Sequence, residues 1–418
     1  MKPLLLLLIF ASSAAAAAPP AGRDVDIMAS DGTGLKATYF AAARPGPAVL
    51  LLHMCITTRE SWEPVARQLS AAGISALTID NRGFGESGGP RFDPGKPEQQ
   101  RQLNEKWPGD FDAAFAWLAA QPGVDKGRIG LGGGSCGVHN AVGLASRHPE
   151  VRSLVLLAGG TDSAGLRYLD ANAWLPIFSA AAADDQFDSQ APQLMRWFAE
   201  VSGNPRNRFV GFSDGRHGTE IFGPHPELPR QIVAWYVDTL VKSPANPTAR
   251  FTRRKTAISE FWAVATQRNA AANATRLFRD ARQRDPNAFL FPEFVLNQLA
   301  YARLQGGDTD DALELFKLNV EAYPTSANAQ DSLADGYVAR GQNDLAIAAE
   351  QKCLDLLPAD KINDQFKAAL RRSAAEKLAK LKAKTFGPAP GRWWFANQRV
   401  PSSEALSLHT LSVNASRR

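Results

Sequence analysis

Cysteine is scarce in this sequence. Its 418 residues include only Cys55, Cys136 and Cys353. An odd and sparse set of cysteines excludes a fold that depends on a framework of disulfides. We therefore expect stability to come from a hydrophobic core, for which a hydrophobic content of 44% is ordinary. We expect all three thiols to be free and shielded, and a Cys55–Cys136 bond stays open as the alternative.

A concentrated basic surface is also missing. The net charge is only +5, and no dense stripe of lysine and arginine with interleaved aromatic residues occurs along the chain. Such a stripe is the electrostatic footprint of proteins that bind nucleic acid. The sequence therefore argues against that class of protein.

The N-terminal apolar run, residues 4–10, is too short to span a bilayer. Lys2 precedes it, and small residues at 14–18 follow it, which is the pattern of a secretory signal. We predict that residues 1–18 are a signal peptide and that the product is exported to the periplasm or outside the cell. No cysteine follows the run at a lipid-anchor position. We also expect no membrane span after cleavage, because the apolar run is too short.

Residues 23–242 alternate between apolar strands and amphipathic helices. This alternation predicts a doubly wound, mostly parallel sheet with helices on both faces. A hairpin is expected at 23–43. Strands are predicted at 48–52, 74–79, 129–134, 154–157, 174–181 and 209–212, and helices near 60–72, 111–120, 138–147 and 227–241.

A glycine cluster follows one of these strands. Residues 133–137 read Gly-Gly-Ser-Cys-Gly and fit G-x-S-x-G, a turn that lifts a nucleophilic serine above a sheet. Only glycine fits where such a sharp turn brings backbone segments together. Ser135 is therefore the candidate nucleophile.

Further polar residues come at the ends of other predicted strands, the edge where sites gather in such sheets. His217 is the candidate general base and Asp185 the candidate acid that orients it. Asp184 and Asp162 are alternative acids. His53 and Asp80 also end strands, and we interpret both as structural.

Three motifs in this order resemble those of the α/β-hydrolase superfamily. Residues 80–87 are similar to its D-x-R-G-x-G-x-S turn, and residues 112–130 resemble the approach to the elbow in dienelactone-hydrolase-like and prolyl-oligopeptidase-like members. Met54 stands where a glycine usually follows His53, and Ala182-Ala183 replaces the usual glycine before the acid. The resemblance implies a Ser-Asp-His triad and no metal or cofactor.

The oxyanion of acyl transfer needs hydrogen-bond donors beside the nucleophile. The backbone N–H of Cys136 is the natural first donor. The second is predicted to be the N–H of Cys55, or else that of Met54. We expect residues 88–109, with Trp62 and Phe84, to shape the substrate pocket; ordinary packing is the equally weighted alternative.

The second half is helical. Residues 293–326 and 327–360 repeat with a period of 34 and resemble tetratricopeptide repeats. We predict a linker at 243–256, a helical repeat domain at 257–384 and an irregular tail at 385–418. The repeats are expected either to bind a peptide or protein partner or to wall the site as a structural appendage.

The sequence therefore predicts an exported serine hydrolase that acts on a carboxylic ester or related acyl compound. A peptidase or amidase with the same triad is one alternative. A catalytically silent hydrolase fold that presents the repeats to partners is the other.

Overall fold

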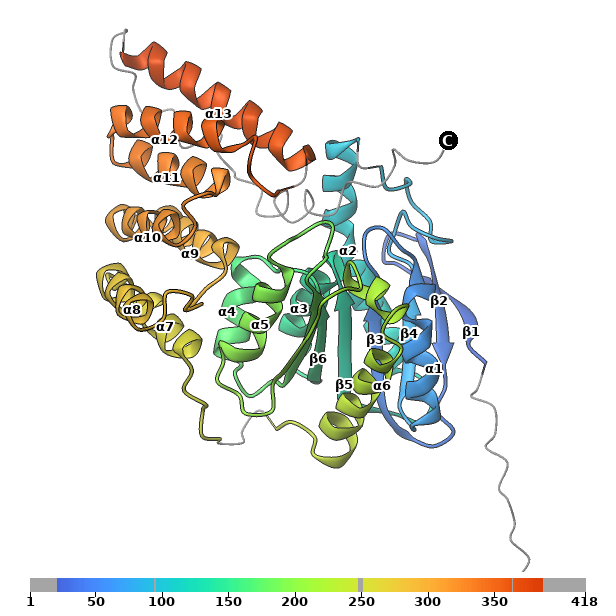
Figure 1. The fold of residues 1–418 in the computed structure, drawn as a ribbon. Helices are drawn as coiled ribbons and strands as arrows, with labels where there is room; N and C mark the ends of the chain where they lie inside the picture. The colour runs from blue at the N-terminus through green and yellow to red at the C-terminus, as the bar shows by residue number, and fades with distance from the viewer. Residues whose placement is uncertain (1–20, 94, 247–250, 363, 386–418) are drawn as a thin grey trace, which may run out of the picture.

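The computed structural model describes residues 21–93, 95–246, 251–362 and 364–385. The predicted signal peptide and, apart from Thr385, the predicted tail lie outside the described residues. Figure 1 shows an α/β unit with a stack of helices at its side, so the predicted fold class is confirmed.

One eight-stranded sheet forms the centre of the α/β unit, in the order β1-β2-β4-β3-β5-β6-β7-β8. The hairpin pairs antiparallel with β4, and all later neighbours pair parallel. The strands are β1 (Arg23–Met28), β2 (Gly34–Phe40), β3 (Gly46–Leu52), β4 (Ser75–Ile79), β5 (Val124–Gly134), β6 (Val151–Leu157), β7 (Ile177–Ala182) and β8 (Arg208–Phe212).

The central strands are apolar because helices cover both faces of the sheet. Leu50 of β3 lies between Leu77 of β4 and Leu131 of β5, and all three are fully buried. Helices α1 (Glu63–Ala71) and α6 (Glu227–Tyr236) pack on one face. The other face carries α2 (Pro97–Ala119), α3 (Cys136–Arg147), α4 (Ser163–Ala171) and α5 (Ala191–Glu200).

Helix α2 differs from the prediction. It begins at Pro97, not near residue 111, and continues through Pro108. A proline inside a helix costs about 3 kcal/mol, which other contacts of the segment must offset. Tertiary contacts hold this segment: the indole N–H of the buried Trp107 donates to the carbonyl of Arg82 over 3.1 Å. Arg82 in turn forms two bonds to Asp110 one turn further along α2.

Of the aromatic residues expected around a pocket, Trp62 and Trp107 lie in the core, whereas Phe84 is partly buried. Trp62 is fully buried, and its indole N–H donates to the carbonyl of Leu52 over 2.9 Å. Its ring packs edge-on against Phe222. For Trp62 and Trp107, ordinary packing is therefore what the structure shows.

Seven helices follow the α/β unit within the described residues. They stack one on the next, with α9 against α4 and α7 against α5 (Figure 1). They are α7 (Ala257–Ala265), α8 (Ala271–Arg284), α9 (Glu293–Gln305), α10 (Thr309–Ala322), α11 (Ala327–Ala339), α12 (Asn343–Leu356) and α13 (Asp364–Thr385). The two predicted repeats coincide with α9–α10 and α11–α12, and their resemblance to tetratricopeptide repeats stays a prediction.

The helical stack packs directly on the α/β unit. Trp262 of α7 meets Trp197 of α5 edge-on, with ring centroids 5.0 Å apart. Ile258 and Val295 belong to the same buried cluster as the sheet. The junction is therefore apolar and continuous with the core. No helix in the described ranges has the length and apolar character needed to cross a membrane.

Candidate active site

Ser135 lies at the turn between β5 and α3, in a conformation that side chains rarely adopt. Its φ is 54° and its ψ is −123°. The flanking glycines permit this turn: a Cβ on Gly133 would lie 2.1 Å from the carbonyl oxygen of Gly137, and one on Gly137 would lie 2.5 Å from that of Leu52. The Ser135 N–H donates to Leu157 of β6 over 2.9 Å. The structure thus holds a serine in strained geometry at the carboxyl edge of the sheet.

Asp185, which follows β7, and His217, which follows β8, form a buried pair at the carboxyl edge of the sheet. The Nδ1 of His217 lies 2.7 Å from Oδ2 of Asp185. The other oxygen of Asp185 accepts the backbone N–H groups of Phe187 (2.9 Å) and Asp188 (3.0 Å). These bonds fix the carboxylate, so Nδ1 carries the hydrogen and Nε2 presents its lone pair.

The Nε2 of His217 is buried and has no hydrogen-bond partner among the described residues. The hydrogen bond between Ser135 and His217 is therefore not formed in this structure. Their chain neighbours, Gly134 and Gly218, both lie against the side chain of Met54. A Cβ on Gly134 would lie 3.1 Å from Met54 Cγ, and one on Gly218 would lie 2.3 Å from Met54 Sδ.

Met54 joins two loops of the site. Its sulfur accepts the N–H of Thr219 at 3.4 Å, so the loop after β3 is tied to the loop that carries His217. The absence of a side chain at Gly134 and Gly218 makes room for it. The departure from glycine at this position is thus accommodated by glycines elsewhere in the site.

His53 supports the same loop from below, as predicted for a structural residue. It is fully buried; its Nδ1 lies 2.6 Å from the carbonyl oxygen of Met54, and its Nε2 accepts the N–H of Asn81 over 2.9 Å. Burial lowers the pKa of this imidazole, which favours the neutral ring that both bonds require. Asp80 is a turn anchor as predicted, since it accepts the N–H of Arg59 and of Glu86.

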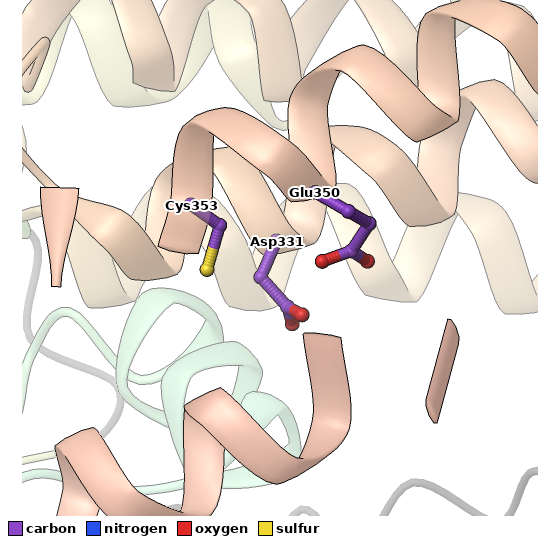
Figure 2. Close-up of side chains that lie close together, drawn as sticks. All are labelled: Asp331, Glu350 and Cys353. Carbon is purple, nitrogen blue, oxygen red and sulfur yellow. The ribbon is translucent and has the colours of Figure 1, made fainter. Parts of the chain in front are cut away.

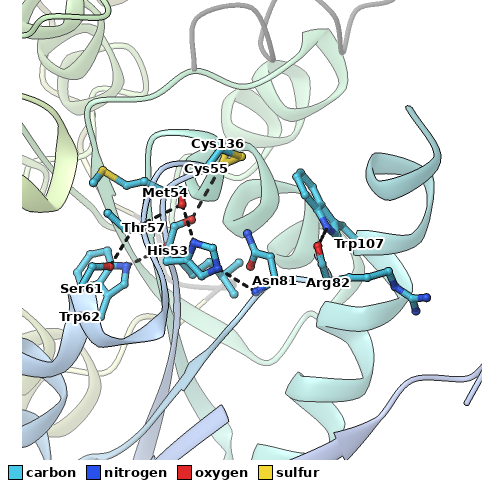
Figure 3. The surroundings of a disulfide bond; sticks show 11 residues. His53, Met54, Cys55, Thr57, Ser61, Trp62, Asn81, Arg82, Trp107 and Cys136 are labelled. Carbon is cyan, nitrogen blue, oxygen red and sulfur yellow. Dashed lines mark hydrogen bonds between the residues drawn. A yellow bond between two sulfur atoms is a disulfide. The ribbon is translucent and has the colours of Figure 1, made fainter. Parts of the chain in front are cut away.

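The two predicted oxyanion donors come from residues that are covalently joined. Cys55 and Cys136 form a disulfide with their Cα atoms 5.9 Å apart (Figure 3). The expectation of three free thiols is therefore wrong for this pair, and only Cys353 is free. Because β3 and β5 are hydrogen-bonded neighbours, the residues that follow them meet at one edge. The sequence alone does not give this strand order, which decides between free thiols and the alternative Cys55–Cys136 bond.

The alternative acids have other partners. Asp184 is exposed and accepts the N–H of Arg216 over 2.8 Å. Asp162 caps α4 by accepting the N–H of Gly165 over 2.8 Å. Neither carboxylate accepts a hydrogen bond from the His217 ring, whereas Asp185 does.

A second buried cluster lies in the helical stack. Asp331, Glu350 and Cys353 offer ligand atoms within 4.8 Å of one another (Figure 2). The ammonium of Lys377, however, lies 3.0 Å from Asp331 and 3.3 Å from Glu350, and 2.8 Å from Asp335 as well. Lys377 of α13 thus already supplies a cation to these acidic groups, and the cluster links α13 to α11 and α12.

The comparisons with known proteins agree with this geometry. A family model described as alpha/beta hydrolase fold matches residues 47–263, a little over half of the chain. The chain belongs to this family. It is 36% identical to an uncharacterized protein of Mycobacterium tuberculosis strain H37Rv over 160 residues, which are 38% of this chain and 52% of that protein. The chain thus spans about half the length of this curated relative.

Two relatives of the hydrolase unit have names that state an activity. Thiohydrolase aneE of Aspergillus aculeatus is 31% identical over 133 residues, 32% of this chain and 40% of that protein. Esterase YjfP of Escherichia coli K12 is 24% identical over 203 residues, 46% of this chain and 75% of that protein. Fold family and relatives together support a hydrolytic role.

Proposed function

We propose that this protein is an exported serine hydrolase that cleaves a carboxylic ester or a related acyl compound. The observation that carries the proposal is the buried His217–Asp185 pair, whose Nε2 has no partner at the edge where Ser135 is strained. A buried polar atom without a partner is costly, and here it belongs to a ring whose other nitrogen is fixed by a carboxylate. A general base must keep this lone pair free for the proton it removes.

In the proposed reaction, Oγ of Ser135 attacks the acyl carbon while Nε2 of His217 takes the hydroxyl proton. Asp185 holds the imidazole in the required tautomer and stabilises its charged form. The N–H groups of Cys136 and Cys55 donate to the oxyanion, each typically contributing about 3 kcal/mol. His217 then gives the proton to the leaving alcohol, and a water activated by His217 releases the acyl group from Ser135.

The substrate class follows from chemistry that esters and thioesters share. Both expel their leaving group more readily than an amide does and pass through the same tetrahedral oxyanion, and the names of YjfP and aneE are those of an esterase and a thiohydrolase. An amide would be cleaved by the same residues, but its amine is a poorer leaving group. The residues of the site are the same for a peptidase and an esterase, so an activity assay distinguishes the two.

Export remains part of the proposal. The predicted signal peptide motivates it, and the Cys55–Cys136 disulfide supports it, because disulfides persist in oxidising compartments. A peptide or protein partner for the helical stack also stays a prediction.

Labelling with a fluorophosphonate probe, together with p-nitrophenyl ester turnover, tests the proposal. We expect wild type to be labelled on Ser135, and Ser135→Ala and His217→Ala to lose turnover by about 10⁴-fold or more. Ser146→Ala is the matched control, because this serine is exposed on α3 and bonds only to the Gly143 carbonyl.

Folded wild-type protein that neither labels nor hydrolyses any ester would contradict the proposal and favour an interaction protein. Faster turnover of aminoacyl p-nitroanilides than of p-nitrophenyl esters would instead identify a peptidase. Circular dichroism of every variant confirms that the fold is kept.

A further inference from the structure

The Cys55–Cys136 disulfide joins the two residues whose N–H groups would hold the oxyanion. Cys136 is the residue after Ser135, and Cys55 lies in the loop after β3 (Figure 3). We infer that this bond is a positioning element of the oxyanion hole, which sets the spacing of the two donors and on which the rate of acyl transfer depends. The inference rests on the proposed function, since only an acyl-transfer site needs the two donors.

Both backbone N–H groups are available for a ligand. Within the described residues, neither the N–H of Cys136 nor that of Cys55 donates a hydrogen bond. Cys136 begins α3, where the first N–H groups of a helix have no partner inside the helix. The free N–H of Cys55 follows from the turn at Met54, whose carbonyl accepts the N–H of Thr57 over 3.1 Å. Two free donors therefore come from residues whose Cα atoms are 5.9 Å apart.

The two donors differ in how firmly the fold holds them. Cys136 is fixed by the strand before it and the helix after it. Cys55 belongs to a loop in which Met54 replaces the usual glycine, held by the contacts of His53, the Met54 sulfur and Thr57. None of these contacts connects Cys55 to Ser135 or Cys136. The disulfide is the direct link between the two donors, and it spans 81 residues of sequence.

A small displacement of one donor has a large effect on rate. Misplacement of a reacting or stabilising group by about 1 Å can lower a rate about 100-fold. Loss of the covalent link frees the Cys55 loop to move away from Ser135. Ground-state binding of substrate needs the oxyanion donors far less than the transition state does. The expected signature is therefore a fall in kcat with little change in KM.

The third cysteine provides a matched control. Cys353 is buried between α11, α12 and α13, and burial raises the pKa of its thiol well above its usual range. A protonated, buried thiol does not take part in exchange. Reduction of the native protein therefore acts on the Cys55–Cys136 pair alone. A dithiol such as dithiothreitol supplies two electrons and two protons: the S–S bond breaks, two S–H bonds form, and dithiothreitol closes to its cyclic disulfide.

The test compares Cys55→Ala/Cys136→Ala with Cys353→Ala, using p-nitrophenyl ester turnover and binding of a trifluoromethyl ketone well below each melting temperature. Oγ of Ser135 adds to the carbonyl carbon of the ketone, its proton passes to His217, and the carbonyl oxygen becomes an oxyanion at the two donors. We expect the double variant to lose about 10- to 100-fold in kcat, with KM within about threefold. Affinity for the ketone should fall by the same factor as kcat/KM. Cys353→Ala should change none of these values.

Should the double variant fail to fold, wild type treated with dithiothreitol replaces it. Thiol counting must show that reduction is complete, and activity should return on reoxidation. A lower melting temperature with unchanged kcat and ketone affinity would mean that the bond is only structural, which overturns the inference and leaves the proposed function standing. Wild type that neither turns over esters nor binds the ketone would overturn the proposed function itself.

Discussion

The α/β unit and the helical stack each bury a cluster of ionisable groups, and these two clusters differ in how their groups are paired. In the α/β unit, Asp185 accepts a hydrogen bond from Nδ1 of His217, and Nε2 is left without a partner. In the helical stack, one cation, Lys377, contacts the carboxylates of Asp331, Asp335 and Glu350. The first arrangement leaves the lone pair of His217 Nε2 available to a substrate. In the second, the ammonium of Lys377 pairs with acidic groups of the fold itself.

The comparison teaches that burial and charge alone do not identify a reactive site. Burial opposes the charge on Lys377, yet Asp331 and Asp335 raise its pKa well above the usual lysine value. A lysine held in this way is a poor proton donor and a poor nucleophile. What distinguishes the His217 cluster is its place at the sheet edge that also carries the strained Ser135. The Lys377 cluster has carboxyl oxygens without a hydrogen-bond partner too, but they surround a cation inside the helical stack.

Replacing the acid in the first cluster should have the largest effect. Asp185→Asn should lower kcat by about 10⁴-fold, because the histidine is no longer held in the tautomer that frees Nε2. Asp184→Asn is the matched control: this exposed neighbour accepts the N–H of Arg216 and does not bond to the His217 ring. Steady-state ester kinetics on both variants measure the effect. A larger loss in the Asp184 variant would reverse the assignment of the acid.

Removing the cation of the second cluster should affect stability and not activity. Lys377→Met leaves Asp331, Asp335 and Glu350 without their cation, and breaking a buried ion pair costs about 3 kcal/mol or more. Lys380→Met, three residues further along α13 and exposed, should stay within about 0.5 kcal/mol of wild type. Urea unfolding followed by circular dichroism gives the free energies. A tenfold loss of kcat at full folding in Lys377→Met would show that the two clusters are functionally coupled.

The sequence predicted the first cluster far better than the second. The strand ends, the G-x-S-x-G turn and the order of Ser135, Asp185 and His217 are local patterns, and each places a residue at one edge of a parallel sheet. The Lys377 cluster joins α11, α12 and α13 across 46 residues, and nothing in the repeat pattern indicates it. The sequence favoured Asp185 and kept Asp184 as an alternative, because a sequence pattern does not show which of two adjacent side chains points inward.

The disulfide and α2 show the same limit in the α/β unit. Both cysteines were recognised at strand ends, but their pairing depends on β3 and β5 being neighbours. Helix α2 begins earlier in the chain than predicted, and contacts of Trp107 and Asp110 with the Arg82 segment outweigh the cost of Pro108 inside it. Local signals predicted the elements, and long-range contacts decided their extent and partners.

The second cluster should also give stability a pH dependence. Burial, with Asp331 nearby, raises the pKa of Glu350 to about 8 from an ordinary value of 4.5. The folded state therefore keeps a proton that the unfolded state releases, so the contribution of this group to stability falls as pH rises from about 4.5 to 8. The slope is at most about 1.4 kcal/mol per pH unit. Glu350→Gln should flatten the curve of melting temperature against pH between 5 and 8.

Glu376→Gln is the matched control for this measurement, because Glu376 is exposed on α13. Its curve should follow that of wild type. Identical curves for wild type and Glu350→Gln would show that Glu350 is ionised in the folded protein at neutral pH, and that Lys377 neutralises it fully.

The smallest expected effect concerns Asp162, the remaining alternative acid. Its carboxylate caps α4, and Asp162→Ala should lower the free energy of unfolding by about 1 kcal/mol, the usual cost of losing an N-cap. Asp162→Asn should restore most of that loss, since asparagine caps a helix as well as aspartate does. Neither change should alter kcat, because Asp185 already bonds to His217. A kcat that falls in both variants, while only the alanine variant loses stability, would mean that the charge at the end of β6 assists the reaction.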